Sequence, residues 1–130
     1  KLRIIDQLAE CDFGDFENKN YRELSGNPDY QAWVDSGGTL PFPGGESREA
    51  CRKRNQEGFR RMVTACIREK AESAAVVVHG GTIMNIMETW AVPEREFYGW
   101  HVKNGRGYLV ELDTGLWRSG REILKVKEEF

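Results

Sequence analysis

Apolar residues recur at helical spacing in two stretches of the chain. Ser47, a good N-cap residue, opens the first stretch, and from Phe59 onward apolar side chains return at steps of three and four. This pattern predicts one long helix with a single buried face. The second stretch begins at the Gly80-Gly81 turn and predicts a helix that ends before Pro93. The first half of the long helix is strongly basic, which favours a solvated face over a surface that contacts substrate.

Four segments have the hydrophobic pattern of strands. Residues 74–79 form a near-continuous apolar run, which predicts a strand buried on both faces and therefore a parallel sheet. A short strand is expected at 2–5, and two more at 107–113 and 122–130, joined across a glycine-containing turn. The order of strands and helices predicts the α/β class: a three-layer α/β/α sandwich whose mostly parallel sheet has an antiparallel edge.

Between the first expected strand and the long helix, the chain is rich in residues that end regular structure. Residues 18–46 contain Asn27-Pro28, a Ser-Gly-Gly triplet and the run PFPGGE. Short helical turns are expected between these breaks, at 21–24 and 28–33. We expect residues 1–130 to form a single domain, because this length supports one core, with 18–46 as a surface excursion.

Composition and charge exclude several classes of partner. The net charge of −2 gives no general attraction to nucleic acid or anionic lipid, so any anionic substrate must be held by local groups. The longest apolar run is far shorter than a membrane span. Cys11, Cys51 and Cys66 are odd in number and form no CxxC pair, which indicates a reduced, cytoplasmic protein.

The junction after the most apolar segment is the strongest candidate for chemistry. His79 ends the expected strand, and Gly80 and Gly81 open the next helix. Ligand sites of open α/β sheets lie beyond the carboxyl ends of strands, and a helix N-terminus offers unpaired N–H groups to an anion. The glycines allow close approach to those amides. His79 is therefore either an anion-binding or acid–base group, or a core histidine with a hydrogen-bond partner.

Other enzyme classes and metal sites lack the residues that they need. A lipase-like hydrolase requires a GxSxG elbow, which the sequence does not contain, and the string NGRGYL fails as a dinucleotide fingerprint because it leads into a strand. His79 and His101 are not at ligand spacing, and the acidic residues of 10–17 do not match a calcium loop. No metal site and no cofactor are expected.

The acidic segment LAECDFGDFE, residues 8–17, follows the first expected strand. A carboxylate near a phosphate site can protonate a leaving alkoxide. For Asp12, Asp15 and Glu17 we favour a structural role at the start of a helix, where carboxylates complement the helix dipole. Glu10 differs from them because of a family resemblance.

Four segments together resemble the histidine phosphatase superfamily, also called phosphoglycerate mutase-like, over nearly the whole chain. They are LAECDFGDFE, PFPGGES, VVVHGGTIMNIM and NGRGYLVEL. The string PGGES before a long helix is similar to the α-ribazole phosphatase-like branch. The chain departs from the family pattern at Asn18 and Arg106, where a glycine and a serine are usual. The resemblance implies the histidine phosphatase fold with its N-terminal strand missing.

The resemblance also implies roles for individual residues. Glu10 falls at the general acid–base position and His79 at the position of the second active-site histidine. Gly80, Gly81 and Asn104 fall at phosphate-binding positions. The family's nucleophile is the histidine of an Arg-His-Gly motif, which this sequence does not contain. The chain therefore resembles the C-terminal portion of such an enzyme, and alone it is expected to be inactive.

The activity that the resemblance implies is hydrolysis of phosphomonoesters through a phosphohistidine, with α-ribazole phosphatase-like or broad specificity. Phosphoglycerate mutase activity and a non-catalytic phosphate-binding module are the alternatives. The compact excursion at 18–46, expected to lie over the active site, favours the phosphatase over the mutase. The expected partners are a small phosphorylated metabolite and either a complementing N-terminal fragment or a second copy of the chain. No nucleic acid and no membrane are expected among them.

Overall fold

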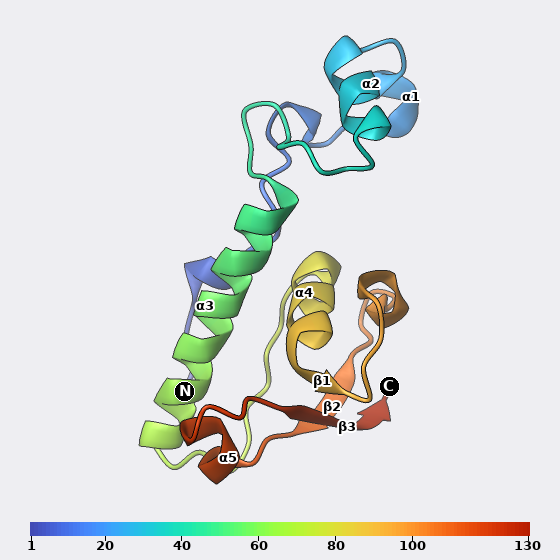
Figure 1. Ribbon diagram of the computed structural model, residues 1–130. Coiled ribbons are helices and arrows are strands. Elements are labelled where there is room, and N and C mark those ends of the chain that lie inside the picture. Colours follow the sequence, from blue (N-terminus) through green and yellow to red (C-terminus); the bar gives the residue numbers. More distant parts are fainter. The chain divides into compact units, whose positions relative to one another are not determined.

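The computed structural model describes residues 1–130, which form two compact units. The larger unit combines Lys1–Glu10 with Asn55–Phe130, and the smaller unit is Cys11–Arg54. The longest helix, α3 (Arg48–Arg68), begins in the smaller unit and ends in the larger one. Figure 1 labels the helices and strands of both units.

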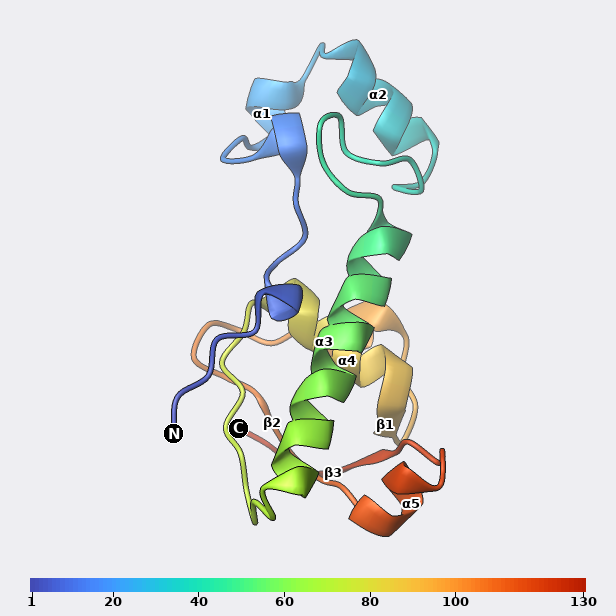
Figure 2. The ribbon, with the colours of Figure 1, turned by 90° about the vertical axis from the view of Figure 1, so that its left-hand side faces the viewer.

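In the larger unit, the part of α3 that begins at Asn55 packs beside α4 (Gly80–Trp90), as Figure 2 shows. Both helices were expected from their apolar spacing, and both are confirmed. Their contact contains the ring pair Phe59–Trp90, with centroids 5.1 Å apart. The short helix α5 (Thr114–Arg118) adds Trp117, whose ring lies 5.6 Å from that of Trp90. These indole and phenyl rings form the centre of the core, together with Leu124.

The sheet of this unit has three strands in the order β1-β3-β2. The strand β1 (Ala91–Val92) leads directly out of α4 and pairs in parallel with β3 (Leu124–Glu129), while β2 (Tyr108–Glu111) pairs with β3 in antiparallel fashion. The strands expected at 107–113 and 122–130 are therefore confirmed as β2 and β3. The connection between them contains α5 rather than a simple turn.

Two expected strands do not form. Residues 2–5 and 74–79 have no strand assignment, and Ile4 and Val77 are 85% and 95% exposed. A strand exists only when a neighbour supplies its ladder of hydrogen bonds, and neither segment has such a neighbour within these 130 residues. The sheet is consequently small, with one parallel and one antiparallel pair, instead of the mostly parallel sheet that the pattern predicted.

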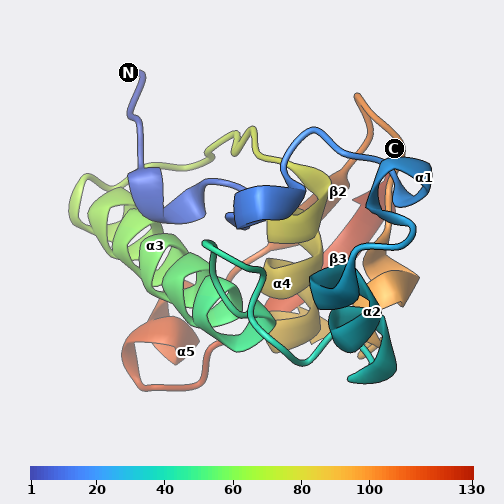
Figure 3. The ribbon, with the colours of Figure 1, turned by 90° about the horizontal axis from the view of Figure 1, so that it is seen from above.

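The N-terminal segment of this unit runs beside α3, as Figure 3 shows in dark blue. It contains the single turn η1 (Asp6–Leu8) and places Leu8 in the core. Gly58 makes this approach possible, because a Cβ at that position would lie 2.7 Å from Gln7 Cβ. The chain segment that ends at Glu10 is thus seated directly on α3.

The smaller unit, Cys11–Arg54, contains η2 (Gly14–Phe16), α1 (Tyr21–Leu24) and α2 (Pro28–Asp35). The helical turns expected at 21–24 and 28–33 are confirmed, and Asn20 and Asn27 cap them through their side-chain oxygens. A cluster of aromatic rings holds the unit together: Phe13, Phe16, Tyr30, Trp33 and Phe42.

The larger unit contains one further helical turn, η3 (Phe97–Trp100), in which Trp100 is completely buried.

Tyr108 in β2 offers a stability test. Its hydroxyl is buried without a hydrogen-bond partner, and its ring packs edge-on against Trp100. Tyr108→Phe removes this unsatisfied group and is expected to raise the free energy of unfolding by about 1 kcal/mol at pH 7, measured by urea denaturation. Lower stability of the variant would show that the hydroxyl makes a net stabilising contact.

The same variant should show a larger advantage in alkaline solution. Burial raises the pKa of Tyr108 above its ordinary value in the folded chain. The unfolded chain therefore ionises first, and the wild-type protein loses stability as the pH rises above about 10. Phenylalanine cannot ionise. The difference in free energy of unfolding between the variant and the wild type should therefore grow from about pH 9 to about pH 11, the range around the ordinary pKa of tyrosine.

Candidate functional site

His79 lies at the N-terminus of α4, where the sequence placed it. It is the N-cap residue, with extended backbone (φ −74°, ψ 161°), and its carbonyl oxygen accepts the hydrogen bond of the Ile83 N–H at 3.0 Å. Its side chain is exposed and makes no capping hydrogen bond. Within these 130 residues the imidazole is therefore not part of the core and is accessible to solvent.

The Glu10 carboxylate lies against the first turn of α4. A Cβ placed on Gly81 would be 2.4 Å from Glu10 Oε1 and 3.2 Å from Oε2, so only a glycine leaves room for this approach. Gly80, one residue earlier, faces open space. The first turn of α4 contains no acidic residue of its own. The structure therefore brings together Glu10, Gly81 and the helix turn that follows His79, from segments about 70 residues apart in the sequence.

Buried polar side chains of α3 and α4 hold the segment that ends at Glu10. The Thr82 hydroxyl donates to the carbonyl oxygens of Leu8 and Ala9, at 3.1 and 3.3 Å. The Asn55 side-chain amide donates to the carbonyls of Gln7 and Ala9, at 3.0 and 3.2 Å. Both side chains have no exposed surface, so these hydrogen bonds are shielded from water.

A second layer fixes the orientation of Asn55. The Asn85 side-chain amide donates to Asn55 Oδ1 at 2.8 Å, and Asn85 is 5% exposed. Gln56, the residue after Asn55, donates from its side-chain amide to Thr89 Oγ1 at 3.1 Å, one turn further along α4 than Asn85. Sequence reasoning missed these supporting residues, since a buried Asn or Thr has no pattern that separates it from a surface one.

Asn104 is not brought into this group. It lies exposed in the turn before β2, and no hydrogen bond connects it to His79, Gly80 or Gly81. Its expected role in phosphate binding stays a prediction. Beside it, a hollow of about 410 Å³ is lined by His101, Lys103 and Arg106, among others.

The remaining acids of the N-terminal motif act locally. Asp12 Oδ1 accepts the Gly14 N–H at 2.9 Å, and Glu17 Oε1 accepts the Phe13 N–H at 2.9 Å. Asp15 lies in the first turn of η2. These contacts agree with the structural role favoured for the three carboxylates.

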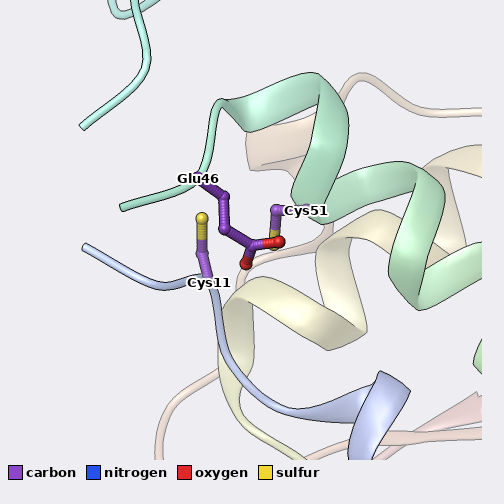
Figure 4. A group of neighbouring side chains, drawn as sticks. All are labelled: Cys11, Glu46 and Cys51. Atoms are coloured by element: carbon purple, nitrogen blue, oxygen red, sulfur yellow. The ribbon is translucent and has the colours of Figure 1, made fainter. Parts of the chain in front are cut away.

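The smaller unit holds a grouping that sequence reasoning did not find. Cys11, Glu46 and Cys51 point toward one another, and their sulfur and oxygen atoms all lie within 4.8 Å of one another (Figure 4). Arg54 donates from Nη2 to Glu46 Oε1 at 2.6 Å and from Nε to Oε2 at 3.0 Å. This hydrogen-bonded ion pair lowers the pKa of the Glu46 carboxyl and raises the pKa of Arg54. The residues are scattered in sequence and match no ligand motif.

The chain belongs to the histidine phosphatase superfamily. The sequence model of "Histidine phosphatase superfamily (branch 1)" matches residues 1–122, nearly the whole chain. The resemblance found in the four sequence motifs is therefore confirmed. A search of curated protein sequences found no match.

Two solved structures share the fold. A candidate alpha-ribazole-5′-P phosphatase from Escherichia coli K-12 MG1655 superposes with a TM-score of 0.73 and 18% sequence identity. The alpha-ribazole phosphatase from Shigella flexneri superposes with a TM-score of 0.69 and 17% identity. Each match covers 99% of this chain and 60% of the other protein, so the chain spans 60% of the length of either relative. The expected α/β fold of the histidine phosphatases is confirmed.

None of the helices combines the length and the apolar character that crossing a membrane requires.

Proposed function

We propose that the protein hydrolyses phosphomonoesters through a phosphohistidine, and that the nucleophilic histidine comes from outside these 130 residues. The observation that carries the proposal is the position of the Glu10 carboxylate against Gly81, in the turn that follows His79. This position supports a role for Glu10 as a proton donor to a phosphoryl group bound at the N-terminus of α4. Membership of the histidine phosphatase superfamily supports the same reaction class.

In the proposed first step, the nucleophile attacks phosphorus and the bond from phosphorus to the alcohol oxygen breaks. Glu10, in its protonated form, gives its proton to that departing oxygen. His79 and the first N–H groups of α4 stabilise the negative charge on the equatorial oxygens. In the second step, the Glu10 carboxylate takes a proton from water while the water oxygen attacks phosphorus, which releases phosphate and the free histidine.

The proposed substrate is a small phosphorylated metabolite, of the α-ribazole phosphate type or of broader range. The coverage of residues 18–46 over the site and the cytoplasmic location stay predictions. Complementation by a separate N-terminal fragment, or assembly with a second copy of the chain, also remains a prediction. The alternative for the chain alone is a phosphate-binding module without turnover, which the lack of any histidine before His79 favours.

Gly81→Ala tests the observation on which the proposed function rests, and a surface variant of α3 is its control. Gly81→Ala places a methyl group where the Glu10 carboxylate lies, and that carboxylate, at the end of a flexible side chain, must move. In the full-length protein we expect kcat for an alkyl phosphate, whose alkoxide needs the Glu10 proton on departure, to fall by about a hundredfold, since small displacements of catalytic groups have effects of this order. Thr64→Ala, on the exposed face of α3 and outside the proposed site, should keep the rate within about threefold of wild type.

Equal losses in the two variants would contradict the role of the Glu10–Gly81 contact. Circular dichroism and thermal unfolding should confirm that both variants stay folded, since alanine is favourable in a helix. The 130-residue chain, assayed in parallel, is expected to show no turnover. Hydrolysis by this chain that His79→Ala abolishes would overturn the proposal of an external nucleophile.

A further inference from the structure

The grouping of Cys11, Glu46 and Cys51 in the smaller unit has the composition of a site for a thiophilic metal ion. Two thiols and one carboxylate converge from three places: the segment after Glu10, the loop before α3, and the first turn of α3. Cys51 is 3% exposed, while Cys11 and Glu46 are half-buried. The group is therefore anchored in the protein on one side and accessible on the other.

The backbone holds these three residues in place. The Asp12 N–H donates to Glu46 Oε1 at 3.0 Å, and the Glu46 N–H donates to the Asp12 carbonyl at 3.0 Å. This reciprocal pair ties the residue after Cys11 to Glu46. Ser47 accepts the N–H groups of Ala50 and Cys51 through its hydroxyl and carbonyl oxygens, both at 3.0 Å, which sets the start of α3.

Arg54 is positioned to hydrogen-bond a ligand of such a site without contacting the metal ion itself. Its guanidinium binds both carboxylate oxygens of Glu46, and its Nη2 lies 3.8 Å from Cys51 Sγ. Ligating carboxylates of metal sites are themselves hydrogen-bonded in this way. Two thiolates, one carboxylate and a divalent cation carry a net charge of −1, which the guanidinium neutralises. The empty and the occupied forms are then both neutral, because binding releases the two thiol protons.

We propose that Cys11, Cys51 and Glu46 bind a thiophilic divalent cation of the zinc class, with a fourth position open to water. Zinc accepts sulfur and oxygen ligands in tetrahedral geometry at about 2.3 and 2.1 Å. Such a tetrahedron separates its donor atoms by about 3.5–3.8 Å, by the same bond lengths. Donors already within 4.8 Å of one another need to approach by only about 1 Å to reach this spacing. This site departs from the sequence-based expectation of no metal, and it does not depend on the proposed phosphatase function.

The test uses Co²⁺ as a spectroscopic substitute for zinc in the fully reduced 130-residue chain. We expect one equivalent to bind with an intense near-ultraviolet thiolate-to-cobalt absorption, and Zn²⁺ to displace it. Cys11→Ser should abolish that absorption, and Glu46→Gln should weaken Co²⁺ binding at least tenfold. Arg54→Gln should weaken binding by about tenfold to a hundredfold, the range for outer partners of metal ligands.

Cys66→Ser is the matched control. Cys66 lies in the other unit, where it contacts Met62 on its own helix, so its replacement should leave the absorption unchanged. Because Cys51 is buried, both Cys51→Ser and Cys51→Ala are needed, with folding checked by circular dichroism. Either folded variant that keeps the absorption overturns the proposal. It is also overturned if reduced protein binds no Co²⁺, including the case in which Cys11 and Cys51 only form a disulfide on oxidation.

Discussion

Replacing Glu10 by glutamine is expected to lower kcat of the full-length protein for alkyl phosphates by about a thousandfold, within the range for loss of a general acid. Glutamine keeps the size and polarity of the side chain but cannot supply the proton that an alkoxide needs on departure. The fold should be preserved, since the Gln7–Ala9 segment is held through its backbone carbonyls by Asn55 and Thr82.

The leaving group separates a general acid from a residue that only shapes the site. A phenolate such as p-nitrophenolate departs without protonation, so Glu10→Gln should slow phosphorylation by aryl phosphates far less than by alkyl phosphates. The measurement is a pre-steady-state rate with each substrate. Glu17→Gln is the control, because Glu17 belongs to the same motif but binds the backbone N–H of Phe13. An equal loss for both substrates would contradict the assignment of Glu10 as proton donor.

Asn55→Ala is expected to have the largest effect on stability, lowering the free energy of unfolding by about 3 kcal/mol. Asn55 is completely buried and makes three side-chain hydrogen bonds that connect the N-terminal segment, α3 and α4. Alanine removes the donor to the Gln7 and Ala9 carbonyls and the acceptor for the Asn85 amide. Polar groups that lose a partner inside a protein cost more than the net strength of the hydrogen bond itself.

Thr64→Ala on the exposed face of the same helix is the control, with an expected change of less than about 0.5 kcal/mol. Denaturant unfolding of both variants gives the comparison. If Asn55→Ala changed stability no more than Thr64→Ala, the network would be dispensable for the fold. Hydrogen exchange at residues 7–10 should also accelerate in Asn55→Ala, because the segment that carries Glu10 loses its attachment.

These predictions share one structural cause. The proposed acid is not part of a helix or strand, so its position depends on side chains from two helices that bind its neighbours' carbonyl groups. Thr82 belongs to the helix that begins after His79, and it binds the segment that ends at Glu10. The same helix therefore provides the proposed anion-binding turn and positions the proposed proton donor beside it.

The sequence by itself determined the family, the two long helices and the two strands β2 and β3. These features can be predicted from the linear sequence, because they depend on local periodicity and short motifs. The periodicity is that of a helix with a regular apolar face, and the motifs are the HGG and PGGES strings. It also identified His79 and Glu10 as candidates. The strands expected at 2–5 and 74–79 failed because strand formation depends on a neighbour, which an apolar run cannot specify.

Only the tertiary structure decided which distant residues meet. It placed the Glu10 carboxylate at Gly81, buried Asn55 and Thr82 as supports for that segment, and gathered Cys11, Glu46 and Cys51 around one point. No periodic pattern in the sequence predicts these contacts, because each joins segments whose separation along the chain is arbitrary. Chain folding brings them together through packing of α3, α4 and the loops, and the chemistry of each group depends on that proximity.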